Sequence, residues 1–141
     1  MATRSTIARH MPNGTVEQVY CHWDGYLSHN GRILLKHYSD PVKLQQLLDL
    51  GDLSVLGPEI GEKHDFDFPP NDVCTFYGRD RGEKNTWKNV HATLAEYFTW
   101  GGREQFNYLY TLDGKWLVRS YENDEPQPLD EALTLEILSQ D

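Results

Sequence analysis

Residues 20–26 (YCHWDGY) place a thiol, an imidazole, an indole, a carboxylate and two phenols within seven positions. Cysteine, histidine and aspartate are all zinc ligands. Successive side chains of a strand point to opposite faces, so Cys21 and His22 cannot reach the same ion while a strand runs through them. The sequence has no recognised zinc spacing. We therefore expect no metal here, and we interpret the stretch as a strand that buries Cys21 and Trp23, followed by an Asp-Gly turn.

Catalysis by a nucleophile requires a serine or cysteine, an adjacent base and a group that orients the base. Cys21 and His22 are neighbours in sequence and cannot form such a pair on a strand, and Cys74 lies in an apolar segment. The chain contains no GxSxG, P-loop or GxGxxG motif. An enzyme is therefore the alternative hypothesis: a small hydrolase or transferase in which His22, Asp24 and His64 meet in space.

The segment YGRDRGEK carries Arg79 and Arg81 two positions apart, with glycines on both sides. In an extended chain both arginines would lie on one side and Asp80 would point away. Guanidinium groups suit phosphate or carboxylate. We expect a site for a phosphate or a partner, built from arginine and aromatic side chains: Arg79, Arg81, Arg103, Tyr77, Tyr20, His22 and Tyr26. The alternative is a surface turn in which acidic neighbours neutralise the arginines.

Two hairpins are predicted, within residues 3–23 and 105–121. Asn-Gly at 13–14 and Asp-Gly at 113–114 are strong hairpin signals. If each dipeptide is a two-residue loop, Ala8 pairs with Val19 in the first hairpin. In the second, three aromatic residues face three residues of the partner strand: Phe106, Tyr108 and Tyr110 against Leu117, Arg119 and Tyr121. Both faces of this second hairpin are partly apolar, which fits a sheet covered on both sides or one that meets another subunit.

A helix at 41–50 is predicted from its leucine spacing, with Asp40 and Pro41 at its start and Gly51 at its end. The pattern elsewhere predicts further elements: helices within 27–38, at 90–100 and in the tail, a strand at 73–79 and a long structured connection at 52–72. This order predicts an α+β fold. We expect an antiparallel sheet of about five strands, two hairpins plus a single strand, with helices packed mainly on one face.

The composition limits the class of protein. A chain of 141 residues with 38% hydrophobic residues fits one globular domain over 1–141. No run approaches the about 18 apolar residues of a membrane helix, and the N-terminal segment lacks the apolar core of a signal peptide, so we expect a cytoplasmic protein. A net charge of −9 argues against general binding to nucleic acid and would suit a basic partner. Cys21 and Cys74 form no CxxC pattern and are expected to be reduced and buried.

Five segments together carry a resemblance to a known family: MATRSTIA, YCHWDGY, LGDLSVLG, YGRDRGEK, and FNYLY with the GKW that follows it. In combination, and over nearly its whole length, the chain resembles a family of small, largely uncharacterised accessory proteins of bacteriophages and prophages. The resemblance implies action in the cytoplasm of the bacterial host. It implies no chemistry and no catalytic residue.

Small acidic phage proteins without catalytic motifs often act by stoichiometric binding, which is an argument by association. The leading hypothesis is therefore a binding protein, without a cofactor, that counters a bacterial defence system. It would cover a basic surface as an anti-CRISPR-like mimic of nucleic acid, or it would sequester a nucleotide immune signal, usually as a homo-oligomer. Its partner is then a host defence protein or a nucleotide, with no membrane involved.

Overall fold

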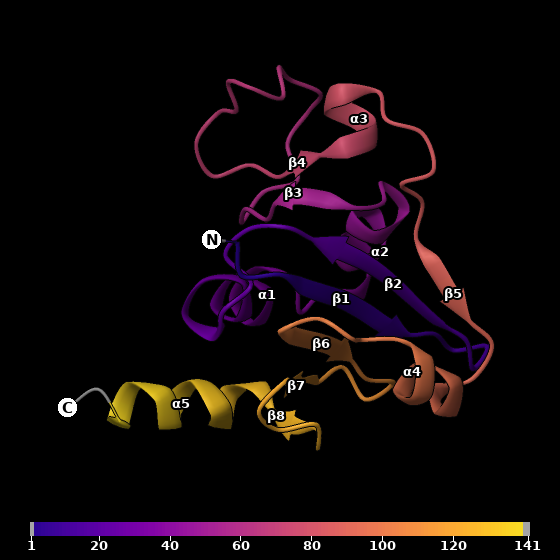
Figure 1. Cartoon of the computed structure of the whole chain (residues 1–141), viewed down its shortest axis with the longest axis vertical. Helices are drawn as coiled ribbons and strands as arrows, with labels where there is room; N and C mark the ends of the chain where they lie inside the picture. Colours follow the sequence, from indigo (N-terminus) through magenta and orange to yellow (C-terminus); the bar gives the residue numbers. More distant parts are fainter. Residues whose placement is uncertain (1, 140–141) are drawn as a thin grey trace.

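The computed structural model describes residues 2–139, and within them eight strands form one mixed sheet (Figure 1). The strand order is β4-β3-β2-β1-β6-β7-β8, and β5 pairs with β2. The strands are β1 (Ser5–His10), β2 (Val16–Cys21), β3 (Leu53–Val55), β4 (Thr75–Phe76), β5 (Asn89–His91), β6 (Phe106–Tyr110), β7 (Trp116–Ser120) and β8 (Gln127–Pro128).

The prediction of an antiparallel sheet of about five strands is wrong. β1 runs parallel to β6, and β2 runs parallel to β3, while the other pairs are antiparallel. The two hairpins therefore join through their first strands. Nothing local in either hairpin specifies this join, because the paired strands lie far apart in the sequence and meet only when the domain is assembled.

Both predicted hairpins are present, β1 with β2 and β6 with β7, but their loops are longer than predicted. The last paired residues leave loops at 11–15 and 111–115. Gly14 and Gly114 have positive φ angles of 92° and 76°, and their amides donate to the carbonyls of the residues three positions earlier, at 2.8 and 3.0 Å. A turn followed by a left-handed glycine gives a bulged loop in place of a two-residue one.

The extra loop residue shifts the pairing of both hairpins by one position. Ala8 pairs with Gln18 rather than Val19, and Tyr108 pairs with Val118. Because side chains alternate between the faces of a sheet, a one-residue slip exchanges the faces of the partner strand. The predicted grouping of the second hairpin's aromatic side chains with Arg119 is therefore wrong.

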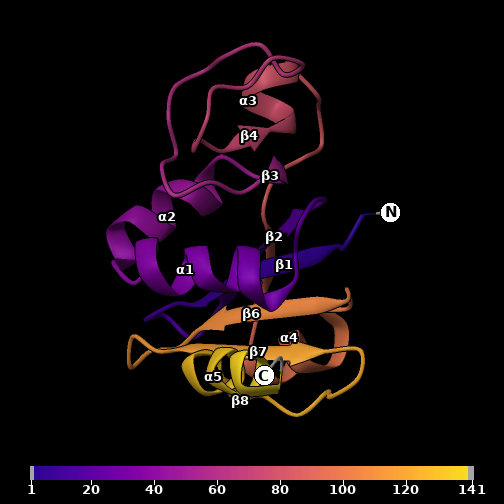
Figure 2. The same ribbon diagram turned by 90° about the vertical axis from the view of Figure 1, so that its left-hand side faces the viewer.

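The helices lie on both faces of the sheet, not mainly on one (Figure 2). They are the π-helical turn η1 (Leu27–Gly31), α1 (Arg32–His37), α2 (Pro41–Asp49), α3 (Tyr77–Arg81), α4 (Leu94–Trp100) and α5 (Leu129–Ser139). α1, α2 and α5 lie on one face and α4 on the other (Figures 1 and 2). α2 agrees with the prediction, since the Asp40 carboxylate accepts the Val42 amide at 3.0 Å and Leu44, Leu47 and Leu48 are buried.

The predicted strand at 73–79 is a strand only in part, and its last three residues are helical. β4 covers only two of its residues, and α3 begins directly afterwards. The Asp80 carboxylate accepts the amide of Phe76, the residue before the helix, at 2.7 Å, and Gly82, with φ of 72°, follows the last residue. The capping carboxylate and the left-handed glycine therefore mark the two ends of a short helix, and the extended conformation stops at Phe76.

The core is divided by the sheet. A large cluster under α1, α2 and α5 includes Ile7, Val19, Cys21, Tyr38, Phe76 and Tyr108, and a small cluster under α4 contains Ala8, Val16, Tyr97 and Leu109. None of the helices in residues 2–139 has the length and apolar character needed to span a membrane.

Candidate functional site

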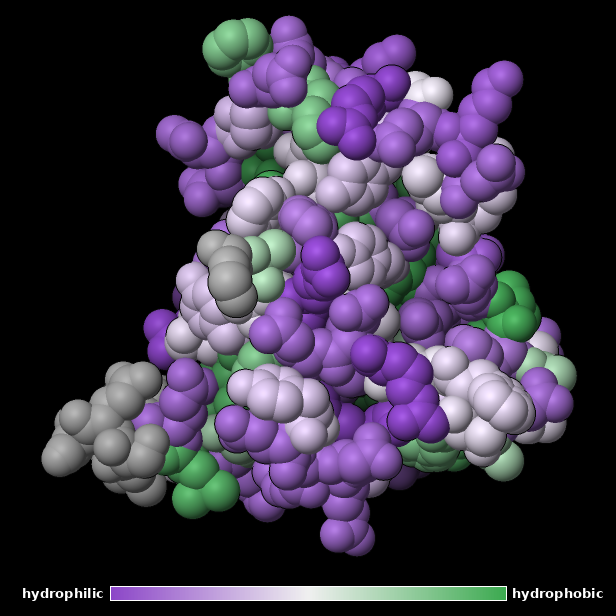
Figure 3. All heavy atoms as spheres, in the orientation of Figure 1, coloured by the Kyte–Doolittle hydropathy of each residue, from purple (hydrophilic) through white to green (hydrophobic). Residues whose placement is uncertain are grey.

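Tyr20 lies on the face of the sheet that carries α4. Its neighbours Val19 and Cys21 are buried in the large core cluster, so alternation along β2 turns Tyr20 the opposite way. α4 does not extend over the end of β2 or over β3, and this part of the face is free of helices (Figures 1 and 2). Hydrophilic and intermediate side chains dominate this face, and hydrophobic ones are scattered over it (Figure 3).

His22 and Trp23 extend this surface beyond the end of β2. Their amides donate to the carbonyls of residues 53–54, both at 3.0 Å, and the strand alternation ends there. Trp23 is 42% exposed, so the prediction that it is buried is wrong, whereas Cys21 is buried as predicted. His22 Nδ1 lies 2.7 Å from the Tyr20 hydroxyl. The indole of Trp23 contacts the His22 imidazole edge-on, with ring centroids 4.7 Å apart.

Tyr77 and Arg81, both on α3, add a second group of rings and a cation. The Tyr77 ring lies 5.6 Å from that of Phe66, which belongs to the long connection before β4. The Arg81 guanidinium lies over both rings, 4.2 Å from the centroid of Phe66 and 5.1 Å from that of Tyr77. Its Nε and Nη2 donate to Glu83. Nη1 makes no hydrogen bond to the described residues, and the side chain is 49% exposed.

Asp52 holds Tyr20 and Tyr77 near one another. Its carboxylate accepts the Tyr20 amide at 2.9 Å, and its carbonyl accepts the Tyr77 amide at 3.2 Å. Burial raises the pKa of Tyr20, Arg4 lowers it, and Glu104 and Tyr77 raise it further. Tyr20 therefore lies within electrostatic range of both the Arg4 cation and the Tyr77 phenol.

These side chains form a surface that we call the aromatic strip: Tyr20, His22, Trp23, Phe66 and Tyr77, with Arg4 beside Tyr20 and Arg81 beside Tyr77. All of the rings are at least partly exposed. The exposed Arg4 side chain makes no hydrogen bond or ion pair with the described residues. Such a surface offers ring faces for stacking and guanidinium donors for an anion.

The backbone and the buried side chains of YCHWDGY make internal contacts that hold this surface in place. The Asn30 side-chain amide donates to Cys21 Sγ at 3.4 Å and to the Trp23 carbonyl at 3.3 Å, and the Tyr108 hydroxyl donates to the Gly25 carbonyl at 2.6 Å. Burial raises the pKa of Cys21 to about 12, although the hydrogen bond from Asn30 lowers it. The thiol therefore stays protonated near neutral pH and is a poor nucleophile.

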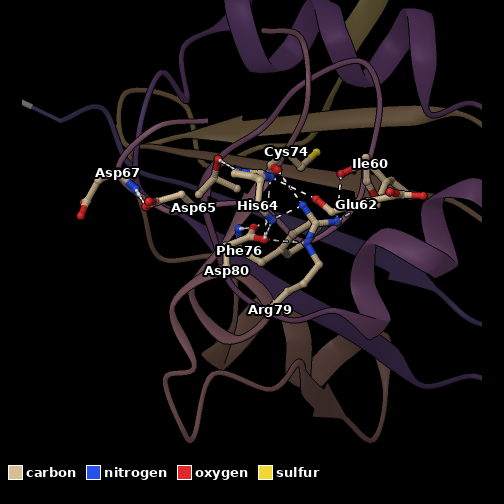
Figure 4. Close-up of polar contacts among 11 residues, drawn as sticks. Ile60, Glu62, His64, Asp65, Asp67, Cys74, Phe76, Arg79 and Asp80 are labelled. Carbon is tan, nitrogen blue, oxygen red and sulfur yellow. Dashed lines mark hydrogen bonds and ion pairs between the residues drawn. The ribbon is translucent and has the colours of Figure 1, made fainter. Parts of the chain in front are cut away.

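Arg79 uses its guanidinium inside the molecule (Figure 4). Nε and Nη2 donate to the Asp80 carboxylate at 3.0 and 3.2 Å. Nη1 donates to the carbonyls of Ile60 and Gly61, and Nη2 also donates to that of Cys74, at 2.9–3.0 Å. All five N–H donors of the group are thereby used. No donor remains for a phosphate, so Arg79 ties the long connection to α3.

Arg79 and Arg81 do not form the predicted clamp. Residues two apart on a helix lie about 200° apart around its axis, so the two side chains leave α3 on opposite sides. Asp80, expected to point away, is 8% exposed and accepts hydrogen bonds from the amides of Phe76 and His64. Burial would raise the pKa of Asp80, but the hydrogen bonds from Arg79 and the two amides outweigh it, and the pKa is lowered.

His64 also belongs to this internal cluster. Its Nε2 lies 3.1 Å from the Thr75 hydroxyl, its Nδ1 lies 3.1 Å from the Glu62 carbonyl and 3.8 Å from the Asp80 carboxylate. The order of carboxylate, imidazole and hydroxyl is that of a nucleophilic triad. Thr75, however, is only 2% exposed, and the Nδ1 hydrogen bond goes to a carbonyl. The group therefore fixes the connection and does not present a nucleophile.

The remaining predicted residues make no hydrogen bond or ring contact with the aromatic strip within residues 2–139. Arg103 follows α4, and its Nη2 donates to the Thr99 carbonyl. Tyr26 precedes η1 and is 39% exposed, with its ring 6.0 Å from that of His29. The structure thus brings together Tyr20, His22, Tyr77 and Arg81 from the predicted set, and leaves out Arg79, Arg103 and Tyr26.

The described residues contain no group of three His, Cys, Asp or Glu side chains arranged to hold a metal ion. No hydrogen bond, ion pair or ring contact within residues 2–139 joins His22 or Asp24 to His64. His22 contacts Tyr20 and Trp23, whereas His64 contacts the Asp80 cluster. The structure thus gives His22 and His64 separate sets of partners and does not assemble the three residues of the hydrolase or transferase hypothesis within residues 2–139.

Sequence reasoning missed Arg4, Trp23 and Phe66 as members of the site. Trp23 had been assigned to the core by strand alternation, and Arg4 lies outside any motif. Phe66 stands in the charged segment HDFDF, and an aromatic residue between acidic ones in a connection was the one available signal.

Comparison of the chain with known protein families, with curated proteins and with solved structures found no match.

Proposed function

We propose that the protein acts by stoichiometric binding of a small nucleotide, and that the aromatic strip is the surface that holds it. The observation that carries this proposal is a set of partly exposed rings with cations near them: the Arg81 guanidinium lies over the Tyr77 ring, and Arg4 is within electrostatic range of Tyr20. Rings of this kind stack on nucleobases, and guanidinium groups pair with phosphate oxygens.

The energies of these contacts are sufficient for specific binding. Stacking of a base on an aromatic side chain contributes about 1–3 kcal/mol, and hydrogen bonds between charged groups are roughly twice as strong as neutral ones. The net charge of −9 works against a long polyanion, since binding a nucleic-acid backbone requires a basic surface. A ligand with only a few phosphates meets the local arginines without much of this repulsion.

The resemblance to phage accessory proteins supports a biological role for such binding. A protein that holds a nucleotide immune signal in a one-to-one or other fixed ratio would lower the concentration that reaches the host defence protein. This role requires no catalytic residue, and it agrees with the internal contacts of the buried Cys21 and Asp80 and of the partly buried His64.

A second candidate function is supported by the charge of the C-terminal region. Residues 120–141 contain seven acidic residues and no lysine or arginine. Five of the acidic side chains are exposed: Glu122, Asp124, Glu125, Asp130 and Glu131. A surface of this kind would suit a mimic of nucleic acid that covers a basic site on a host defence protein.

The experiment is calorimetric titration of the protein with mononucleotides and cyclic dinucleotides. We expect saturable binding with a fixed stoichiometry for at least one nucleotide, and loss of that binding in the double variant Tyr77→Ala, Arg81→Ala. The matched control is Trp100→Ala, Arg103→Ala, which removes an exposed aromatic residue and an arginine after α4. Binding that survives in the Tyr77, Arg81 variant would overturn the proposal.

A different variant distinguishes the second candidate function, mimicry of nucleic acid, from nucleotide binding. If nucleotides do not bind and a basic host protein does, replacing Glu122, Asp124 and Glu125 with glutamine or asparagine should weaken that capture, and raising the salt concentration should weaken it as well. This outcome would replace the nucleotide proposal with the second candidate.

A further inference from the structure

Arg119, in β7, is a second buried arginine, and it lies under α4. The residue is 4% exposed. Its guanidinium lies over two rings of α4, 5.1 Å from the centroid of Tyr97 and 4.9 Å from that of Phe98. Gly102, with φ of 56°, brings the loop after α4 so close that a Cβ there would collide with the guanidinium. Rings and backbone thus fix the position of this cation.

The hydrogen bonds of Arg119 are few and long. Nη2 donates to the Gly101 carbonyl and Nη1 to the Asp124 carboxylate, both at 3.4 Å. Normal N–H···O bonds are about 2.7–3.2 Å long. Asp124 itself is 78% exposed. The buried Tyr97 hydroxyl lies beside the guanidinium and interacts with it electrostatically, but it makes no hydrogen bond of normal geometry to the described residues. A buried guanidinium with so little compensation has an unmet requirement for an anion.

An open pocket leads to this cation. It has a volume of about 430 Å³ and is lined by Phe98, Arg119, Asp124, Glu125 and Pro126. Phe98 and Pro126 supply an apolar wall, and Asp124 occupies the position at which an anion meets the guanidinium. Because Asp124 is exposed and its contact is long, an incoming anion can displace it at little cost.

We propose that Arg119 is the anion-binding group of a second ligand site, which takes a small monocarboxylate attached to an aromatic or apolar group. The ligand carboxylate replaces that of Asp124 on the guanidinium, and its apolar part packs against Phe98 and Pro126. Asp124 and Glu125 line the same pocket, so a doubly charged phosphate meets more repulsion than a carboxylate does. The site is distinct from the aromatic strip, and neither proposal depends on the other.

The test uses benzoate as the ligand and benzamide as its neutral counterpart, with ¹⁵N NMR of the arginine Nε–H groups as the readout. We expect benzoate, but not benzamide, to shift the Arg119 signal saturably. In Asp124→Ala the competing carboxylate is gone, and the affinity for benzoate should rise by about two- to fivefold, the range expected for loss of an exposed ion pair. The control is Asp67→Ala, which removes the same charge from a side chain that points away from its neighbours (Figure 4), and it should leave the affinity unchanged.

The variant Arg119→Met tests the same site by removing the cation while keeping an unbranched side chain over the rings. Calorimetric binding of benzoate should be lost in this variant while the far-UV spectrum and cooperative unfolding remain. Equal shifts from benzoate and benzamide, absence of any shift in both the wild type and Asp124→Ala, or benzoate binding that survives in a folded Arg119→Met protein would each overturn the proposal.

Discussion

Arg79 and Arg119 are both largely buried, but their surroundings differ. Arg79 donates all five of its N–H groups, to a buried carboxylate and three carbonyls, at 2.9–3.2 Å. Arg119 has two acceptors at 3.4 Å, one of them on an exposed aspartate. Arg79 therefore links two segments of the chain, whereas Arg119 has N–H donors that are not engaged at normal hydrogen-bond distances. Burial alone therefore does not separate a structural arginine from a binding one, whereas the completeness of its hydrogen bonding does.

The largest effect is expected for Arg79→Met. This change leaves Asp80 buried without its cation and frees three carbonyls of the connection and β4 region, so the free energy of unfolding should fall by about 3–5 kcal/mol. Urea denaturation followed by circular dichroism measures it. The control is Arg81→Ala on the other side of α3, which should cost about 1 kcal/mol or less because the pair with Glu83 is exposed. Equal effects of the two changes would contradict the comparison.

Acid should weaken the Arg79 region because the pKa of Asp80 is lowered in the folded protein. A carboxyl with a lowered folded pKa stabilises the fold above its unfolded pKa of about 3.9, and this contribution is lost as the pH falls toward the folded pKa. The difference in unfolding free energy between the wild type and Asp80→Asn should therefore shrink as the pH falls from about 5 to below 3.9, with most of the loss below 3.9. A difference that stays constant across that interval, measured by urea denaturation at each pH, would show that Asp80 is not the group responsible.

Arg119→Met is the matched counterpart of Arg79→Met and should have a much smaller effect on stability. The residue loses two long hydrogen bonds, its partner Asp124 remains in solvent, and the methionine side chain keeps apolar contact with Tyr97 and Phe98. Replacement of a weakly compensated buried charge by an apolar group is often neutral, so we expect a change of about 1 kcal/mol or less in either direction. A fall in the free energy of unfolding as large as that of Arg79→Met would mean that Arg119 also holds segments of the chain together.

A similarly small effect on stability is expected for Trp23→Ala, in the aromatic strip. A buried tryptophan truncated to alanine costs about 3–5 kcal/mol, but Trp23 is 42% exposed and packs on His22, so its loss should cost about 1 kcal/mol or less. Thermal unfolding measures this, and titration with the nucleotide that binds the wild type should show weaker binding. A large loss of stability would place Trp23 among the core residues after all.

The sequence was informative wherever the signal was local. The Asn-Gly and Asp-Gly turns located both hairpins, and Asp40, Pro41 and the leucine spacing located α2. The apolar faces of the second hairpin fitted either a sheet covered on both sides or one that meets another subunit, and the structure has the first arrangement around β6 and β7. The predicted strand register was wrong in both hairpins for the same reason. The loop glycines form bulged turns, which shift every residue pair by one position.

Other features had no local signal. The parallel pairing of β1 with β6 joins segments from opposite ends of the chain. The helix α3 in place of a strand depends on Asp80, whose burial requires Arg79 and the connection at 60–61. Phe66 comes to Tyr77 only when that connection folds back over α3. Each of these requires contacts between distant segments, which the residue pattern of a short window does not specify.

The sequence by itself determined which segments turn, which helix is capped and which residues have the chemistry to bind an anion. Only the tertiary structure decided which arginines are available to do so. A guanidinium has five donors, and whether they are satisfied depends on carbonyls and carboxylates brought from elsewhere in the chain. For Arg79 the acceptors come from residues 60, 61, 74 and 80. For Arg119 the loops at 101 and 124 supply acceptors at 3.4 Å. For Arg81 the rings of Phe66 and Tyr77 support the cation, and its Nη1 is left without a hydrogen bond to the part of the chain that the structure describes.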